Sequence, residues 1–316
     1  MGRYLIRRFL WMIVVVIGVS IVVFSLIHIT PGDPAQIMLG PTAGMDEVQA
    51  LRHQLGLDQP IFKQYAIWAS HVVQGDLGTS IVLRRPVLDE VVGRFRNTAL
   101  LAIAAIVLSF TIGTALGILS AVRRGSAVDR FVMLMATFGL SLPSFWFGLM
   151  LIILFSVRLG WLPGTGMMSA VNGGSALDIA QHLVLPALAL AVVPLAVIAR
   201  YTRSAMLEVL GQDFVRTARA KGLSEGAVTW GHVFRNTLVA LVTMLGLQVG
   251  FLLAGAVYIE NVFSWPGIGQ MLVDAILKRD FPLVQGGVLL VATVYVFVNL
   301  LTDLLYAALD PRITLT

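Results

Sequence analysis

The polar stretch Asp213-Phe214-Val215-Arg216-Thr217-Ala218-Arg219-Ala220-Lys221-Gly222 separates two long apolar runs, at about residues 183–206 and 237–258. Gly222 suits the end of a helix, because a left-handed backbone conformation costs glycine little. Basic residues in the last turn complement the helix dipole. The stretch therefore predicts a short basic helix between two membrane spans. A second short helix is expected at about Ser224–Phe234, with the serine as its N-cap.

The first of these helices has an amphipathic face. Leu210, Phe214, Ala218 and Lys221 recur at helical spacing on one side of it. Basic charge alone is typical of a solvated loop beside a span. A loop with two helices of its own favours docking, because amphipathic helices commonly lie in grooves on other proteins. We expect Phe214 and Ala218 to seat in a soluble partner.

The composition indicates a membrane protein. The chain has 316 residues, of which 58% are hydrophobic and 12% charged, with a mean hydropathy of +0.88. Soluble domains have about 25% charged residues. The net charge of +5 does not indicate nucleic acid, because the basic residues flank apolar runs and are typical of topology signals in a lipid bilayer. The sequence has no cysteine, which excludes disulfides, thiolate metal sites and cysteine nucleophiles.

Six apolar segments are long enough to cross a bilayer, which takes about 20 helical residues. The first is read as an uncleaved anchor, because no small-residue cleavage site follows it. The predicted fold is all-α, with three parts: residues 1–29, an extracytoplasmic segment 30–97, and a five-span core 98–316 that contains the docking loop 207–236. The six predicted spans cover residues 9–29, 98–122, 131–157, 183–206, 237–258 and 283–308.

The distribution of lysine and arginine predicts the orientation. Most basic residues fall on the side of the N-terminus and of the docking loop, which places both chain ends and that loop in the cytoplasm. The long segment 30–97 then lies outside. Apolar residues at helical spacing from Ala50 to Trp68, interrupted by Gly56 and Pro60, predict short helices there.

No catalytic or metal site is predicted. The five histidines show no helical pair four residues apart, and a zinc site needs at least three converging ligands. None of the three lysines lies in a G-x-x-x-x-G-K-[ST] phosphate loop. Energy for any transport must therefore come from a partner or from an ion gradient, and a gradient-driven secondary transporter is the alternative class.

Polar residues within the spans are candidates for a translocation path. These are Gln248 in the fifth span and Asn299 with Asp303 in the last one. The alternative is helix packing, which Gly246 and Gly250, four residues apart, also favour.

Other residues predict span ends and bends. Trp146, Trp161 and Trp265 lie near span ends, where interfacial anchoring is the usual explanation. Pro143 in the third span, and Pro186 and Pro194 in the fourth, are expected to kink the helices or to break their hydrogen bonding.

The docking stretch, with Arg216-Thr217-Ala218 followed by Gly222, resembles the cytoplasmic loop of bacterial ABC importer permeases, in the dipeptide, oligopeptide and nickel branch. The resemblance covers essentially the whole chain. The other matching motifs are Gly18-Val19-Ser20, Pro31-Gly32-Asp33-Pro34-Ala35, Leu55-Gly56-Leu57-Asp58-Gln59-Pro60, Gly75-Asp76-Leu77-Gly78, Leu142-Pro143-Ser144-Phe145-Trp146, Phe263 with Pro266-Gly267-Ile268-Gly269, Arg279-Asp280-Phe281-Pro282 and Asp310-Pro311-Arg312.

This resemblance implies a type I importer permease fold with six transmembrane helices, in the bacterial inner membrane. It also implies three kinds of partner: a second homologous permease, two cytoplasmic ATPases that bind the ATP and Mg²⁺, and an extracytoplasmic binding protein. Di- or oligopeptides are the expected substrates, with nickel chelates or glutathione as alternatives. The residues implied in ATPase coupling are Asp213, Phe214, Arg216, Thr217, Ala218, Arg219, Lys221 and Gly222.

Two residue pairs depart from the general family pattern. Arg216 and Thr217 stand where the general loop begins with glutamate and alanine, as is usual for the peptide branch. Val239-Ala240 replaces a common Leu-Pro pair, which predicts a straighter start to the fifth span.

Overall fold

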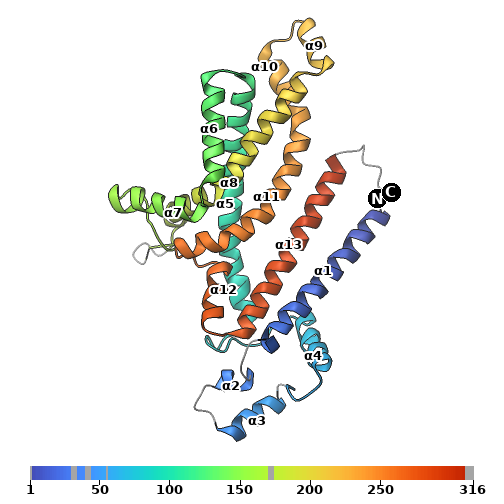
Figure 1. Ribbon diagram of the computed structural model, residues 1–316, viewed down its shortest axis with the longest axis vertical. Helices are drawn as coiled ribbons and strands as arrows, with labels where there is room; N and C mark the ends of the chain where they lie inside the picture. Colours follow the sequence, from blue (N-terminus) through green and yellow to red (C-terminus); the bar gives the residue numbers. More distant parts are fainter. Residues whose placement is uncertain (1, 30–33, 40–43, 55, 170–173, 310–316) are drawn as a thin grey trace. The chain divides into compact units, whose positions relative to one another are not determined.

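The computed structural model describes residues 2–29, 34–39, 44–54, 56–169 and 174–309, which are almost entirely helical (Figure 1). Within these ranges the only extended pairing is an isolated bridge between Thr79 and Pro86. The helices are α1 (Gly2–Ile29), α2 (Pro34–Leu39), α3 (Met45–Gln54), α4 (Ile61–Val73), α5 (Val87–Val122), α6 (Ala127–Ser141), α7 (Ser144–Leu151), the π-helix η1 (Ile152–Arg158), α8 (Ala176–Leu210), α9 (Asp213–Ala220), α10 (Glu225–Ala227), the π-helix η2 (Val228–Phe234), α11 (Arg235–Val262), α12 (Ile268–Leu277) and α13 (Phe281–Leu309).

The chain forms two compact units. Unit 1 comprises Met1–Arg96 and Met271–Phe297. Unit 2 comprises Asn97–Gln270 and Val298–Thr316. The predicted division at residues 29 and 97 is of a different kind, because it follows the ends of predicted spans. It stays a prediction about which residues lie outside the membrane.

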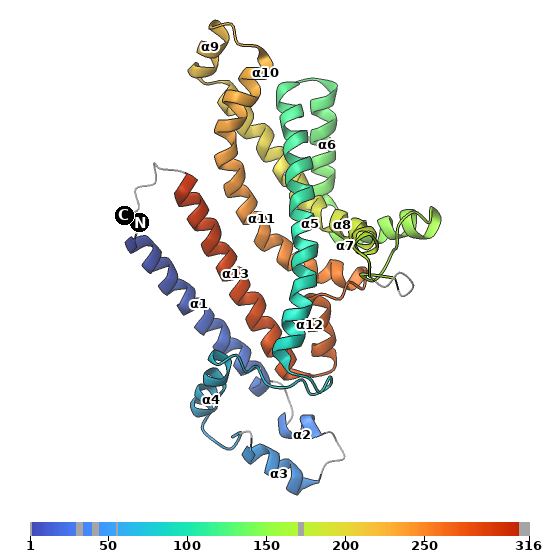
Figure 2. The ribbon, with the colours of Figure 1, turned by 180° about the vertical axis from the view of Figure 1, so that it is seen from behind.

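Most predicted spans correspond to long apolar helices. Five of the described helices are long and apolar enough to cross a membrane. The third predicted span is not a single helix, because α6 and the α7–η1 pair meet at a bend of 104° (Figure 2). Pro143 accounts for the break: it disfavours helical backbone at Leu142, which is extended with φ −82° and ψ 128°. The predicted break at Pro143 is therefore confirmed, and a total of six spans counts this bent pair as one.

The other two prolines act differently. Pro186 and Pro194 are both buried inside α8, and the helix continues past them from Ala176 to Leu210. The fourth predicted span is therefore one continuous helix, in which each proline lacks the backbone N–H donor of a helical hydrogen bond. Neighbouring helices in membrane proteins can satisfy the backbone groups that a proline frees, so such prolines are tolerated.

Unit 1 joins the first span to the helices that follow it. As predicted, α3 and α4 are separate helices, divided at Gly56, which has a φ of +67°. The Ser20 and Tyr65 hydroxyls lie 2.7 Å apart, and the Phe24 and Trp68 rings pack at 5.7 Å, so α4 lies against α1. Leu55 and Asp33 of the quoted motifs lie outside the described residues.

The helix that contains the second predicted span begins before that span. α5 starts at Val87 rather than at residue 98, because Asp89 and Glu90 in its first turn suit a helix N-terminus. The buried Asp280, directly before α13, accepts a hydrogen bond from the Ser80 hydroxyl and one from the backbone N–H of Val82 at 3.1 Å. It thereby ties the segment before α5 to the start of α13 inside unit 1.

Unit 2 has the larger core, in which α8 packs against α6, α7 and α11. The helices approach closely at glycines. A Cβ on Gly117 would lie 2.5 Å from the Thr202 Cβ, and a Cβ on Gly113 would lie 2.8 Å from the Leu195 carbonyl oxygen. α5 and α8 are therefore in backbone-to-backbone contact along these turns.

Trp265 belongs to this core. It is fully buried, and its indole N–H donates to the Asn97 carbonyl at 3.0 Å. The predicted interfacial role is wrong for Trp265, because the ring lies in the buried cluster that contains Leu101 and Leu185. The other two tryptophans near span ends are exposed, Trp146 by 43% and Trp161 by 69%.

A buried carboxylate holds the same turn in place. Glu260 accepts hydrogen bonds from the Thr98 hydroxyl at 2.6 Å and from the Gly269 N–H at 2.7 Å. A Cβ on Gly267 would lie 2.2 Å from this carboxylate, so only glycine fits there. The Pro266-Gly267-Ile268-Gly269 motif is therefore a structural element that joins α11, α12 and the start of the second predicted span.

Candidate docking site

The predicted docking helix is present as α9, Asp213–Ala220. It ends as expected: Gly222 has a φ of +80°, in the left-handed region that favours glycine. Ser224 then caps α10, its hydroxyl accepting a hydrogen bond from the Ala227 N–H at 3.4 Å. The predicted helix boundaries at Gly222 and Ser224 are confirmed.

One side of α9 is buried by the chain itself. Val215 is fully buried and Ala218 is 6% exposed. They pack into a cluster that includes Ile118 and Ala121 at the end of α5, Met206 in α8, and Val228 and Val233 in η2. We call this set the docking-helix cluster. Figures 1 and 2 both show α9 and α10 at the same end of unit 2 as the turn between α5 and α6.

This packing corrects one prediction. Ala218 was expected to share the partner-facing side with Phe214, but it faces the docking-helix cluster. The reason is that Val215 and Ala218 are three residues apart and share a helical face, and this face has apolar partners within the chain. Phe214 is not part of this cluster and is 38% exposed.

The outward side of α9 is basic. Arg216, Thr217, Arg219 and Lys221 are all exposed. The Arg216 guanidinium contacts the Asp213 carboxylate at 3.4 Å, and the Thr217 hydroxyl donates to the Asp213 carbonyl at 3.0 Å. The helix therefore presents one large apolar side chain, Phe214, among cationic ones.

An ion pair closes the loop after α9. The Arg219 guanidinium donates two hydrogen bonds to the Glu225 carboxylate, at 2.8 and 3.1 Å. The hydrogen bond from arginine lowers the pKa of Glu225, and the same contact raises the pKa of Arg219. Because both side chains are largely exposed, the pair is worth little stability by itself. It joins the end of α9 to the start of α10.

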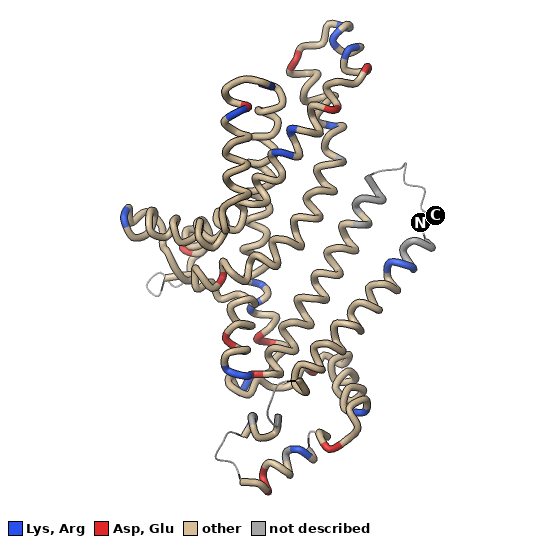
Figure 3. The backbone as a smooth tube through the Cα atoms, in the orientation of Figure 1, with Lys and Arg blue, Asp and Glu red and all other residues tan. Residues whose placement is uncertain are grey.

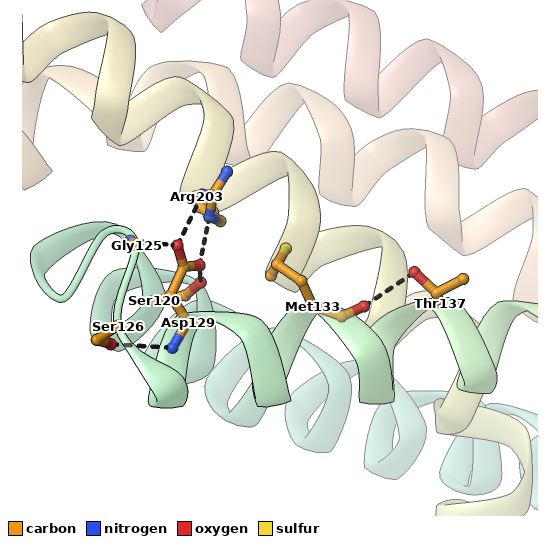
Figure 4. A network of polar contacts seen from close by, with 7 residues as sticks. All are labelled: Ser120, Gly125, Ser126, Asp129, Met133, Thr137 and Arg203. Atoms are coloured by element: carbon orange, nitrogen blue, oxygen red, sulfur yellow. Dashed lines mark hydrogen bonds and ion pairs between the residues drawn. The ribbon is translucent and has the colours of Figure 1, made fainter.

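A second ion pair, missed from the sequence, lies close to this end of unit 2 (Figure 4). Arg203 in α8 donates to both carboxylate oxygens of Asp129 in α6, at 2.7 and 2.9 Å. The Ser120 hydroxyl and the Gly125 N–H also donate to this carboxylate. The pair ties α5, α6 and α8 together about two turns before α8 ends at Leu210. A carboxylate and a guanidinium inside apolar helices were the available signal, since such groups usually pair.

The docking loop continues directly into α11. α10, η2 and α11 follow one another without a break from Glu225 to Val262. The predicted second helix therefore leads without a break into the helix that contains the fifth predicted span, rather than forming a separate element. The helix also runs through residues 239 and 240, as the absence of a proline there predicted, although the side chain of Val239 lies outside the described residues.

The candidate path residues are located on α11 and α13. Gln248 and Asn299 are half-buried, and no hydrogen bond between the described side chains joins them. The Asp303 side chain lies outside the described residues. Gly246 packs directly on α13, because a Cβ there would lie 1.9 Å from Thr302. The packing interpretation of the small residues is confirmed for Gly246.

The charged residues of unit 2 are unevenly distributed along its helices. Figure 3 shows basic residues gathered around α9, the α5–α6 turn and the last turns of α8, and none along the middle of α6 and α11. The helices that carry long uncharged stretches are thus continuous with a basic, water-exposed end.

Long apolar helices with an exposed basic end define a multi-span membrane subunit. The chain belongs to the binding-protein-dependent transport system inner membrane component family, whose pattern matches residues 113–315. The corresponding N-terminal family matches residues 1–102. The protein is therefore a permease subunit of an ABC importer in the inner membrane. It is non-catalytic, and proteins of this family work with ATPase and substrate-binding partners.

Relatives and a solved structure agree with this family. The chain is 45% identical to the di/tripeptide transport system permease DppB of Pseudomonas aeruginosa, with 99% of each chain covered. It is also 45% identical to the glutathione transport system permease GsiC of Escherichia coli K12, again over 99% of both. The MetNI methionine ABC transporter shares the fold, with a TM-score of 0.54 at 19% identity over 70% of this chain and 96% of that one. The predicted type I importer permease fold is confirmed.

Proposed function

We propose that this subunit forms half of the translocation pathway of a di- or oligopeptide importer and is driven through α9. A second, homologous permease would form the other half, two ATPases would bind ATP and Mg²⁺, and a binding protein would deliver the substrate. The full-length similarity to a di/tripeptide permease supports the peptide class. The equal similarity to a glutathione permease keeps glutathione as a second candidate, and nickel chelates remain the alternative that the sequence motifs left open.

The observation that carries the coupling role is the two-sided character of α9. Its inner side, Val215 and Ala218, is buried in the docking-helix cluster, while Phe214 and the basic residues face outward. A partner that binds the outward side therefore moves a helix that is packed on α5, α8 and η2. The push reaches α11 through an unbroken helix.

The energy required is within reach of nucleotide binding. Moving a two-state equilibrium from 1:99 to 99:1 takes about 5.5 kcal/mol. The Asp129–Arg203 pair and the close contacts at Gly117 hold α5, α6 and α8 together, so these helices would move as one body. The docking helix, this body and α11 are the elements that we expect to shift.

The proposed orientation places the docking loop 207–236 and both chain ends in the cytoplasm, where the ATPases are. The excess of lysine and arginine on that side supports it. Segment 30–97 would then face the binding protein. Gln248, Asn299 and Asp303 are proposed to line the path, on the grounds that polar groups within spans commonly face water or protein.

The coupling proposal is tested with the complete transporter in liposomes, using ATPase activity stimulated by the loaded binding protein. Phe214→Ala removes the exposed aromatic anchor, for which we expect a loss of about tenfold or more. Gly222→Arg, at the left-handed position after α9, is expected to abolish stimulation while the subunit still inserts. Phe131→Ala, an exposed phenylalanine in α6 outside the docking helix, is the matched control and should leave stimulation unchanged. Normal stimulation in both docking variants would refute the proposal.

The substrate is tested separately on the cognate binding protein. A thermal-shift screen against dipeptides, tripeptides, glutathione and nickel chelates should show stabilisation by peptides, because ligands that bind the folded state raise its melting temperature. Stabilisation by nickel chelates alone would replace the peptide assignment without affecting the coupling proposal.

A further inference from the structure

A cavity of about 260 Å³ lies within unit 1, outside the docking site. It is enclosed by the last turns of α1, by α4 with the turn after it, and by the first turn of α13. Its walls are mostly apolar and include two aromatic rings. The residues that give it chemical character are Phe24, His28, Gln64, Trp68, Asp76 and Gln285.

Two of the polar groups serve to build the wall. The His28 Nε2 and Gln64 Oε1 atoms lie 3.0 Å apart, which joins α1 to α4. The Gln64 amide nitrogen donates to the carbonyls of Leu57 and Gln59, at 3.1 and 2.8 Å. These groups are satisfied by the protein, so they shape the cavity rather than bind a ligand.

The other two polar side chains, Gln285 and Asp76, offer oxygen atoms that can accept hydrogen bonds. Gln285 is 5% exposed and donates its amide nitrogen to the Val23 carbonyl at 3.3 Å. Its amide oxygen accepts no hydrogen bond from the described residues, and Gln285 lines the cavity, so this oxygen can accept from a ligand. The Asp76 carboxylate accepts from the Gly78 N–H at 2.9 Å and contacts His71 Nδ1 at 3.1 Å, which leaves part of its acceptor capacity open.

The charge at Asp76 is negative at neutral pH. The hydrogen bond from the Gly78 N–H and the one with His71 lower the pKa of the Asp76 carboxyl. The cavity thus combines a carboxylate at its rim, an open amide oxygen in its wall, and the rings of Phe24 and Trp68, which pack 5.7 Å apart. Carboxylate, amide oxygen and aromatic faces are together suited to an ammonium group joined to an apolar chain.

The cavity lies where two spans end. The apolar stretches Ile6–Ile29 of α1 and Phe281–Thr302 of α13 both terminate at it. α4 beside it carries exposed apolar side chains, Phe62 at 75% and Val73 at 87%. Exposed apolar side chains close to polar groups are typical of a membrane–water interface, where tryptophan is also enriched.

We propose that this cavity binds the primary ammonium head group of an aminophospholipid, with the adjoining part of the lipid against Phe24 and Trp68. The ammonium donates hydrogen bonds to Asp76 and to the Gln285 amide oxygen. A lipid occupies the site because the cavity opens at the end of two spans, where phospholipid head groups are at high local concentration. A trimethylammonium head group has no N–H, so it cannot satisfy the amide oxygen.

The test uses the complete transporter, purified and stripped of lipid, and native mass spectrometry with added lipid. Phosphatidylethanolamine should bind about tenfold more tightly than phosphatidylcholine of the same chains, because only the former donates hydrogen bonds. Asp76→Asn and Gln285→Leu should each remove this preference. Asp58→Asn, a nearby carboxylate outside the cavity that lies 3.9 Å from His53, is the matched control and should keep it.

Three results would overturn the proposal. One is equal binding of the two lipids by the unmodified transporter. Another is retention of the preference in Asp76→Asn, whose exposed side chain makes a folding defect unexpected. The last is a soluble amine such as leucinamide that displaces phosphatidylethanolamine at equal concentration, which would assign the site to free amines instead.

Discussion

Val215→Ala tests how α9 is held to the rest of the protein. The side chain is fully buried in the docking-helix cluster, so the substitution removes two buried carbon atoms. At roughly 0.8 kcal/mol for each, the helix loses about 1.6 kcal/mol of attachment, before any cost of the cavity. Since 1.4 kcal/mol corresponds to a factor of ten, detached α9 becomes about 15-fold more populated. Hydrogen–deuterium exchange of residues 213–222 in the purified transporter should accelerate by this factor.

Thr217→Ala is the control for this measurement. Thr217 lies on the outward side of the same helix and bonds only within it, to the Asp213 carbonyl. Exchange in this variant should stay close to that of the unmodified protein. If Val215→Ala exchanged normally while Thr217→Ala exchanged faster, α9 would be attached through its other face and the assignment of inner and outer sides would be refuted.

Three further substitutions or conditions probe the rest of the structure. Asp129→Ala leaves Arg203 without its carboxylate and should destabilise the subunit by about 3 kcal/mol, seen as a lower melting temperature. Gly267→Ala places a methyl group against Glu260 and should likewise lower the melting temperature, because the carboxylate is fixed by several hydrogen bonds. Acid should loosen the turn at Asp76. The pKa of its carboxyl is lower in the folded protein than the value of about 3.9 in the unfolded chain, so the ionised carboxylate stabilises the fold above that pH. This stabilisation is lost as the pH falls through the folded pKa. Exchange of the Gly78 amide should report that loss.

Matched controls accompany these tests. Arg130→Ala removes an exposed charge next to Asp129 and should leave the melting temperature unchanged. Gly231→Ala adds a methyl group where nothing lies within 4 Å and should be tolerated. An equal decrease in melting temperature for Asp129→Ala and Arg130→Ala would show that the Asp129–Arg203 pair contributes no more to stability than an exposed charge does. Gly78 exchange that does not respond to acid would contradict the role given to Asp76.

Local signals in the sequence predicted local features well. Pro143 predicted the break in the third span, and Gly222 and Ser224 predicted the boundary between α9 and α10. These residues act on the backbone of one or two positions, so their effects can be predicted without knowledge of the fold. The motifs around them also carried the family resemblance.

Features that depend on distant contacts were not predictable. Spacing placed Phe214 and Ala218 on one face, but only the cluster beneath α9 decides which side is buried. The Asp129–Arg203 pair joins residues 74 positions apart. Trp265 lies near the end of a predicted span, as interfacial tryptophans do, yet in the structure it is fully buried. In each case a tertiary contact determined the outcome, and the local sequence does not encode which surface will supply that contact.

The most direct test of coupling through α9 is cysteine cross-linking to the partner ATPase. The chain has no cysteine of its own, so one introduced residue gives one defined reactive site. Phe214→Cys, on the exposed side, should cross-link to cysteines in the ATPase groove, with a yield that changes on nucleotide binding. Ala218→Cys, on the buried side, should not react in the assembled transporter. Efficient cross-linking at position 218 with none at position 214 would contradict the proposed docking of α9.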